Sequence, residues 1–148
     1  MAVTGAEIQV RPMIQDDIDG IFEIDRKIGA TERAFTYADL INGYIGGDIG
    51  TSVVAEVNGQ VVGFALAAIT YVADQITEAC TIQVVGVDPD YRRQGIARKL
   101  IGALTQNCQS RGLKLIRVMV DQHDAELQGL FDSLDFRRGQ LIDYSKNL

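Results

Sequence analysis

Apolar residues recur along the chain at two different spacings, and each spacing predicts one kind of secondary structure. Residues 7–11 alternate polar and apolar positions and then meet Pro12, which predicts a first strand ending at a breaker. Over residues 16–28 the apolar side chains follow the helical period, and Asp16 or Asp17 stands where a helix cap belongs. The chain therefore opens with a strand followed by an amphipathic helix.

The clearest local signal is a hairpin in the middle of the chain. Two β-rich runs, residues 51–57 and 60–71, are joined by Asn58 and Gly59 alone. An Asn-Gly pair favours a two-residue turn, because both positions tolerate the positive φ that matches the twist of paired strands. The sequence therefore predicts two antiparallel strands here.

The rest of the chain continues this mixture of helical and strand periods. The further predicted segments are a weak helix over 35–44, a strand over 79–87, a helix over 95–111, a strand over 113–120, a helix over 125–134 and a strand over 140–145. In the first of these strands Gly86 marks either a β-bulge or a close backbone approach. No repeat, low-complexity stretch or linker divides the chain, so we expect one mixed α/β domain over residues 1–148.

The composition is that of a globular protein with its own core. Of 148 residues, 47% are hydrophobic and 23% are charged. No apolar run is long enough to span a membrane, and residues 1–10 lack the charged start and apolar middle of a signal peptide. These features predict a cytoplasmic protein without a membrane partner.

Residues suited to metal binding or redox chemistry are few and scattered. Cys80 and Cys108 show no C-x-x-C spacing and His123 is the single histidine, so we expect no metal and two ordinary buried thiols. The formal net charge of −6 opposes nucleic-acid binding. It suits a cationic partner such as an amine, although an acidic surface also serves solubility alone.

A basic turn leads from the strand that ends at Val87 into the following helix. The free N–H groups of a helix's first turn attract a phosphate, and Gly95 and Ala97 are small enough for its close approach. Arginine side chains around the turn add bidentate donors. A solvated basic face is the alternative interpretation. The chain lacks the glycines of a P-loop or a dinucleotide-binding Rossmann turn, so neither motif explains the segment.

The same run resembles the acetyl-CoA signature of the GNAT acetyltransferases, in which Arg or Gln is followed at fixed distances by Gly and by Gly or Ala. Its members here are Arg92, Arg93, Gln94, Gly95, Ile96 and Ala97. The resemblance extends over about residues 8–136 and includes the Asn58-Gly59 hairpin. It implies an α/β (α+β) GNAT fold: a central mixed, mostly antiparallel sheet of six to seven strands, about four flanking helices, and splayed fourth and fifth strands.

The resemblance also implies the cosubstrate and the reaction. The pantetheine arm of acetyl-CoA is expected to pair with the backbone of Val85, Gly86 and Val87, and the pyrophosphate to bind at the signature together with Arg98. A neutral amine then attacks the thioester directly in a ternary complex, without a covalent acyl-enzyme. The acceptor is expected to be a primary amine of a small molecule, of a peptide or protein N-terminus, or of a lysine.

The tyrosine that serves the leaving thiol in many members of this family is missing. Alignment with the family's motif puts Phe131 in its position, and phenylalanine has no proton to donate. Tyr144 on the predicted terminal strand is a candidate in its place, with water or an unassisted thiolate of pKa about 8.5 as alternatives. Glu78, just before the fourth strand, and Asp121 and His123, just after the fifth, are candidate bases, acting directly or through water.

Two aromatic residues after the first helix, Phe35 and Tyr37, are candidates for contacts with the acceptor, and Phe35 is alternatively a core anchor. The stretch from Glu23 to Phe35 looks faintly like ribosomal-protein alanine N-acetyltransferases.

Because Phe131 leaves the acid unassigned, a catalytically degenerate acyl-CoA-binding domain stays open as an alternative, as does a purely structural domain. Analogy with the family also allows a homodimer that pairs through the last strand.

Overall fold

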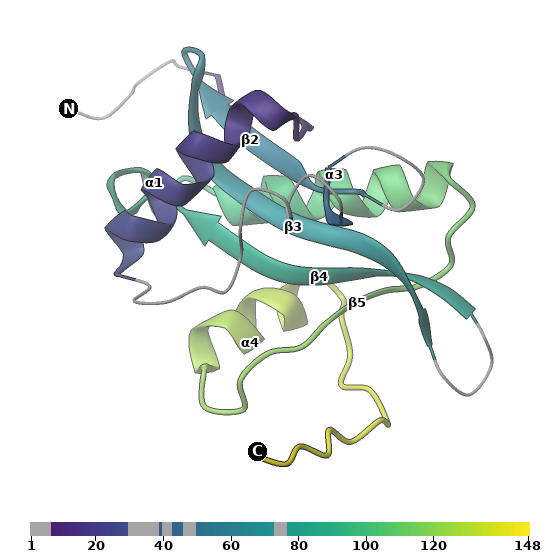
Figure 1. The fold of residues 1–148 in the computed structure, drawn as a ribbon. Helices are drawn as coiled ribbons and strands as arrows, with labels where there is room; N and C mark the ends of the chain where they lie inside the picture. The colour runs from purple at the N-terminus through teal and green to yellow at the C-terminus, as the bar shows by residue number, and fades with distance from the viewer. Residues whose placement is uncertain (1–6, 30–38, 40–42, 46–49, 73–76) are drawn as a thin grey trace.

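Five strands form one open sheet in the computed structural model, which describes residues 7–29, 39, 43–45, 50–72 and 77–148. In chain order they are β1 (Gln9–Pro12), β2 (Val53–Val57), β3 (Gln60–Val72), β4 (Thr77–Val87) and β5 (Ile116–Val118). The strands lie side by side in that same order. The first three neighbouring pairs are antiparallel, whereas β5 runs parallel to β4. The expected mixed, mostly antiparallel sheet is confirmed (Figure 1).

Helices cover both faces of this sheet. They are α1 (Ile18–Ile28), α3 (Ile96–Ser110) and α4 (Ala125–Ser133), with two short 3-10 turns, η1 (Gln15–Asp17) and η2 (Pro89–Tyr91). Helix α1 crosses one face, while α3 and α4 lie on the other (Figure 1). None of the helices in the described ranges is long and apolar enough to cross a membrane.

The hairpin forms at the predicted turn. Asn58 and Gly59 adopt φ values of 52° and 79°, the left-handed conformation that a two-residue turn of this kind needs. Beyond the turn β3 runs for 13 residues and pairs with β2 on one side and with β4 on the other. It is therefore the central strand of the sheet.

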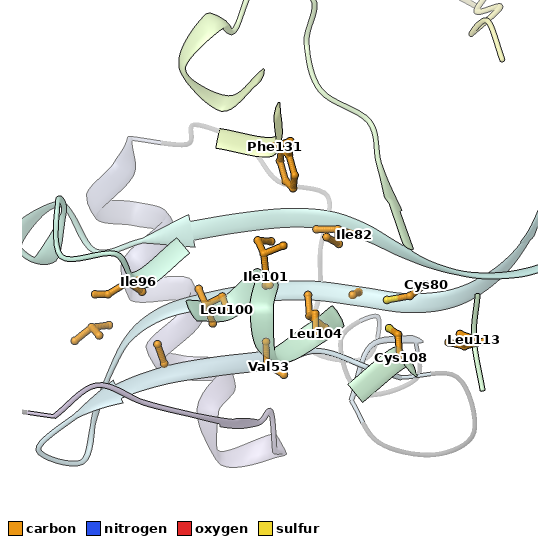
Figure 2. Packing of buried hydrophobic residues seen from close by; sticks show 14 of the residues in the cluster. Val53, Cys80, Ile82, Ile96, Leu100, Ile101, Leu104, Cys108, Leu113 and Phe131 are labelled. Carbon is orange, nitrogen blue, oxygen red and sulfur yellow. The ribbon is translucent and has the colours of Figure 1, made fainter. Parts of the chain in front are cut away.

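Alternation along β3 gives the sheet an apolar core on each face. Phe64 and Leu66 pack with the apolar stripe of α1. Ala65, which lies between them, points the opposite way and belongs to the core under α3 and α4. Figure 2 shows side chains of α3 in this second core, among them Leu100 and Leu104, directed at the strands.

Two free thiols lie side by side in the second core. Cys80 on β4 and Cys108 on α3 are both buried, as expected from the sequence (Figure 2). A hydrogen bond with Cys108 lowers the pKa of Cys80 against the effect of burial, and the Thr51 hydroxyl contributes in the same direction. The hydrogen bond with Cys80, together with burial, raises the pKa of the Cys108 thiol.

An ion network holds the edge of the sheet at β1. Arg11 donates to the Asp17 carboxylate at 2.8 and 2.9 Å and to Glu56 of β2 at 3.1 Å. Asp17 is only 5% exposed and also accepts the N–H of Ile14 at 2.8 Å. Burial opposes ionisation, but the hydrogen bonds from Arg11 and Ile14 outweigh it and lower the pKa of Asp17. Asp17 stands at the N-cap position of α1, as predicted, but its carboxylate is used in this network and makes no capping hydrogen bond to α1.

The structure differs from the expectation at the C-terminal end of the chain. The predicted strand over 140–145 does not form, and residues 137–148 are exposed and without regular structure (Figure 1). A strand needs a neighbouring backbone to pair with, and within the described ranges this segment has none. The described sheet therefore has five strands and not six to seven. The predicted helix over 35–44 falls largely outside the described residues, which contain three α-helices.

Candidate cosubstrate site

Strand β4 carries a bulge at the point where it separates from β5. Leu66 of β3 faces Val84 and the next residue, Ala67, faces Ile82, so Gln83 has no partner in β3. On its other side β4 pairs with β5 only as far as Ile82. The two strands therefore separate directly after Ile82, and the expected splay of the fourth and fifth strands is confirmed.

Beyond the bulge one edge of β4 has no neighbouring strand among the described residues. From Gln83 to Val87 the strand follows β3, but in the part of the chain that the structure describes it does not pair with β5. In an antiparallel pair, alternate N–H and C=O groups point away from the partner strand. Val85, Gly86 and Val87 therefore lie together on a backbone edge that faces the side where the strands diverge.

Gly86 is required by its neighbour and not by the bulge. A Cβ at this position would lie 2.6 Å from Cε1 and 2.7 Å from Cζ of Phe64, so only glycine leaves room for the ring. Phe64 is itself 1% exposed and belongs to the core under α1. Of the two interpretations of Gly86, the close approach is confirmed. The bulge interpretation is wrong, because the unpaired residue is Gln83, nearer the start of the strand.

The loop between β4 and α3 contains two residues in the left-handed region. Arg93 has a φ of 65° and Gly95 a φ of 76°. Glycine adopts this conformation freely, whereas an L-residue with a side chain loses about 1 kcal/mol or more. Arg93 is therefore held in a strained conformation by the surrounding structure, which is a common feature of binding loops.

Helix α3 presents the N–H groups of its first turn without a side-chain cap. The first intrahelical bond runs from the N–H of Lys99 to the C=O of Gly95 at 3.1 Å, so the N–H groups of Ile96, Ala97 and Arg98 precede the ladder. The first turn contains no acidic residue, so no carboxylate neutralises the positive end of the helix dipole. This arrangement favours an anion at the start of the helix.

Close packing on β3 fixes the start of α3. A Cβ at Gly63 would lie 2.7 Å from Cγ2 of Ile96 and 3.3 Å from Cδ1 of Leu100. Ile96 and Leu100 are both buried, so the first turns of the helix lie directly on the backbone of the strand. The position of the free N–H groups is therefore set by the core.

A buried carboxylate ties the end of β4 to α1. Asp88 is 1% exposed; its Oδ1 accepts the N–H of Asp90 at 2.9 Å and its Oδ2 accepts from Nζ of Lys27 at 3.0 Å. The N–H of Asp88 donates to the C=O of Val62 at 2.8 Å. The hydrogen bond to Asp88 is the main reason why the pKa of Lys27 is raised, with a smaller contribution from Asp90. These contacts hold the turn from which the basic loop starts.

The polar side chains predicted to hold the pyrophosphate differ in their surroundings. Arg92, Arg93 and Gln94 are exposed around the loop. Arg98 donates to Oγ of Ser133 at 2.7 Å and thus connects α3 to α4. The structure therefore brings the predicted residues together in one loop and one helix turn, with Arg98 directed at α4.

The candidate acids and bases are placed at three different positions. Asp121 and His123 are exposed in the turn after β5, where the N–H of His123 donates to Asp121 at 2.7 Å. This turn lies beyond the end of β5 at which the strands diverge. Glu78 is exposed and lies before the segment of β4 that pairs with β5, and its carboxylate accepts from the hydroxyl of Tyr71 at 3.4 Å. Tyr144 is 91% exposed in the C-terminal segment.

Phe131 occupies a core position. It is 4% exposed and packs edge to face on Phe136, with 5.0 Å between the ring centroids. The residue in the expected tyrosine position therefore serves packing between α4 and the chain that follows it. Phe35 and Tyr37, the candidates for acceptor contacts, lie outside the described residues.

Three further residues belong to this site and were missed in the sequence. Gln83 forms the bulge, and Lys27 and Asp88 fix the turn before the loop. Asp88 directly follows the strand predicted to end at Val87, but the lysine that binds it is 61 positions away along the chain. No pattern of neighbouring residues identifies such a pair.

Residues 17–136 match the Acetyltransferase (GNAT) family, and the chain belongs to that family. The resemblance stated from the signature is thereby confirmed, and acetyltransferase is the enzyme class of the family. A protein of Yersinia pestis (strain Pestoides F) named "Acetyltransferase" is 30% identical over 95 residues, which cover 64% of this chain and 63% of that protein. The matched segment thus spans a little less than two thirds of that relative's length.

Solved structures share the fold over nearly the whole chain. The aminoglycoside N-acetyltransferase AAC(6')-Iy in complex with CoA is similar with a TM-score of 0.80 at 20% identity, over 100% of both chains. The ribosomal-protein-alanine N-acetyltransferase of Brucella melitensis biovar Abortus 2308 is similar with a TM-score of 0.76 at 15% identity, over 96% of this chain and 100% of that one. At these identities the likeness is one of fold.

Proposed function

We propose that this protein transfers an acetyl group from acetyl-CoA to a primary amine by direct attack in a ternary complex. The observation that carries the proposal is the open backbone edge of β4 from Gln83 to Val87, continued by a basic loop and an uncapped helix start. An extended chain with amide groups suits the edge, and a pyrophosphate suits the helix start. The structure of the aminoglycoside N-acetyltransferase with CoA supports this choice, since that protein has the same fold.

The residues of the loop fit a pyrophosphate. The N–H groups of Ile96, Ala97 and Arg98 are the backbone donors, and Arg92, Arg93 and Gln94 are the side chains around them. A Cβ at Gly95 would meet nothing within 4 Å, so the entrance to the helix is open. On β4, the backbone of Val85, Gly86 and Val87 would hold the pantetheine arm.

Acetyl-CoA, when bound, supplies a thioester carbonyl for attack by the amine. In the transfer the N–C bond forms and the C–S bond breaks, and the sulfur takes the electron pair. The acceptor ammonium loses two protons, of which one ends on the sulfur and one passes to base or solvent. An N–H of the open β4 edge is the donor that we propose for the carbonyl oxygen.

Asp121 and His123 are the bases that we propose first, because their turn follows β5 on the side where the strands diverge. Both are exposed, so a water relay to the amine is the suitable route. Glu78 and Tyr144 stay as weaker candidates for base and acid. With Phe131 buried in the core, we propose that the thiolate leaves unassisted and is protonated by solvent.

The acceptor that we propose is an amine-bearing small molecule or an amine of a peptide or protein. The names of the structural neighbours include an aminoglycoside and a ribosomal-protein alanine acetyltransferase, so both kinds of acceptor occur on this fold. Phe35 and Tyr37 are the proposed contacts to it. We propose that the protein is cytoplasmic. We also propose that it has no nucleic-acid partner, because the net charge of −6 opposes binding to a polyanion.

We also propose a homodimer, on the evidence of the C-terminal segment. Leu141, Ile142, Tyr144 and Leu148 are exposed in it by 64% or more. Exposed apolar side chains in such a group are suited to an interface. Light scattering of the full chain should give twice the monomer mass of 16.2 kDa, and a monomer at micromolar concentration would refute this part of the proposal.

A catalytically degenerate acyl-CoA binder is the alternative, and one observation favours it. Phe131 is fixed in the core and cannot donate a proton to the leaving thiol. Both functions predict binding of acetyl-CoA. Only the enzyme predicts release of free thiol that depends on an added amine.

Calorimetric titration with acetyl-CoA, with coenzyme A and with pantetheine, which lacks the pyrophosphate, tests whether acetyl-CoA is the cosubstrate. We expect micromolar affinity that depends on the pyrophosphate. The double variant Arg92→Ala/Arg93→Ala should bind acetyl-CoA roughly tenfold or more weakly, because it loses two charged donors. The control Lys114→Ala/Lys146→Ala removes two exposed charges elsewhere and should retain the affinity. Equal binding by both double variants would refute the pyrophosphate site.

A further inference from the structure

A row of polar side chains crosses three strands next to the point where β4 and β5 separate. Nε of Arg117 on β5 donates to Oγ1 of Thr81 on β4 at 3.1 Å. Oγ1 of Thr81 lies 2.6 Å from Oγ1 of Thr70 on β3. Thr81 accepts from Arg117, so its own proton is free to go to Thr70. The row therefore fixes the direction of the arginine side chain.

This row lies on the face of the sheet opposite α3 and α4. The neighbours of Thr81 in β4, Cys80 and Ile82, belong to the core under α3. Ile116 and Val118, the neighbours of Arg117 in β5, pack against the same core. Because side chains alternate along a strand, Thr81 and Arg117 point the other way. Figure 1 shows that α1, on that face, does not reach across β5.

The row also lies at the inner end of the proposed cosubstrate site. Arg117 faces Thr81 in the ladder, and the next pair, Ile82 with Val118, is the last before the bulge. The open edge from Gln83 to Val87 spans about 13 Å, and the pyrophosphate site lies beyond its far end. An arm that starts at the pyrophosphate and follows this edge therefore brings its thioester end toward Arg117.

The guanidinium of Arg117 has unused donors. It is half-buried, and among the described residues no carboxylate forms an ion pair with it. With Nε bound to Thr81, the two Nη groups remain available for a ligand. Partly buried charges without a partner are costly, and a guanidinium is suited to bind a carboxylate with two parallel hydrogen bonds.

We propose that Arg117 binds the carboxylate of the acceptor, so that the acceptor is a small amine of the amino-acid class. This proposal rests on the proposed function. It distinguishes two classes of acceptor that the proposed function allows, amino acids and polycationic amines. An α-amino acid offers a carboxylate to Arg117 and an amine to the thioester end of the site. A polycationic amine such as an aminoglycoside would place positive charge against the guanidinium.

The test compares matched acceptors in the presence of acetyl-CoA. A set of L-amino acids is assayed against the corresponding α-carboxamides, with an aminoglycoside as a third class. We expect kcat/KM to be about tenfold or more higher for the best acid than for its amide, since the amide lacks the charge. Equal rates for acid and amide, or a preference for the polycation, would overturn the proposal and leave the acetyltransferase function intact.

Variants assign the preference to Arg117. Arg117→Gln should bring the ratio of acid to amide close to one, while its affinity for acetyl-CoA stays within about twofold of the parent. Arg117→Lys should keep part of the preference, and Thr81→Val, which removes the hydrogen bond to Nε, should reduce it. Lys114→Gln, an exposed charge just before the same strand, is the control and should leave the ratio unchanged. A ratio that persists in Arg117→Gln would refute the assignment.

Binding provides a readout that does not need turnover. Calorimetry of the same acids and amides with the protein saturated in coenzyme A should show acid binding that Arg117→Gln loses. If no amine is acetylated but this difference is found, the catalytic function fails and the carboxylate site stands. If acids do not bind better than amides, the carboxylate site fails whatever the turnover.

Discussion

Arg11 lies on β1 at one edge of the sheet and Arg117 lies on β5 at the other, and the two differ in what surrounds them. Arg11 forms ion pairs with Asp17 and Glu56, and these partners raise its pKa. Arg117 has one hydroxyl partner, Thr81, and no ion pair within the described residues. At the β1 edge the arginine is occupied by carboxylates of the protein itself. Near the β5 edge, the two Nη groups of Arg117 and the backbone edge of β4 remain available to a ligand.

This difference separates stability from function along one sheet. Changes at the β1 edge should affect unfolding and leave acetyl-CoA binding intact. Changes near the open edge of β4 should affect both, or binding alone. Three substitutions, Gly86→Ala, Asp17→Ala and Lys27→Met, should reveal this separation, with a decreasing effect on stability in that order.

Gly86→Ala should have the largest effect, because the new Cβ would lie 2.6 Å from the ring of Phe64. We expect a loss of about 2–3 kcal/mol in the free energy of unfolding, since a core cannot absorb the added group without shifts. Urea denaturation measures it, and acetyl-CoA affinity should fall as the open edge moves. Gly102→Ala on α3, where a Cβ meets nothing within 4 Å, is the matched control and should not destabilise.

Phe64→Leu provides a second check on Gly86→Ala. If the ring is the cause, the double variant should lose less stability than the sum of the two single losses. Additive losses would show that the ring is not the reason for glycine at this position.

Asp17→Ala should cost about 2 kcal/mol, because it leaves Arg11 and the N–H of Ile14 without their buried partner. Acetyl-CoA affinity should not change. The pKa of Asp17 is lowered in the folded state, so its stabilisation is full above the unfolded value of about 3.9 and is lost as pH falls through the lower folded value. Thermal unfolding followed as a function of pH should therefore show the difference between parent and variant shrinking as the pH falls below about 3.9.

The outcome that would contradict this prediction is specific. A difference between parent and Asp17→Ala that does not shrink as the pH falls below about 3.9 would show that the carboxylate charge is not the source of the stabilisation. Weaker acetyl-CoA binding by Asp17→Ala would show that the two edges are not independent.

Lys27→Met should have the smallest effect on stability, because the lysine itself is at the surface and the buried carboxylate of Asp88 keeps its hydrogen bond from the N–H of Asp90. It should nevertheless raise the KM for acetyl-CoA, by roughly tenfold or less, because the loop loses one of its supports. Lys27→Arg should restore much of the affinity. An unchanged KM in Lys27→Met, measured at saturating amine, would remove Lys27 from the positioning of the loop.

Local sequence patterns predicted much of the fold and the centre of the site. The Asn58-Gly59 turn, the apolar stripe of α3 and the run from Arg92 to Ala97 are each defined by residues close together in the chain. Their conformations follow from backbone freedom, helical period and the free N–H groups of a helix start. The family of the protein was therefore recognisable from a short segment and its flanks.

The tertiary structure decided the features that depend on segments far apart in the chain. The bulge lies at Gln83 and not at Gly86, because it depends on the register with β3 and on where β5 ends. The pattern over 140–145 suits a strand, but a strand forms only beside another backbone. In the same way, the partner of Asp88 and the isolation of Arg117 arise because the fold brings together, or keeps apart, charges that the sequence leaves unconnected.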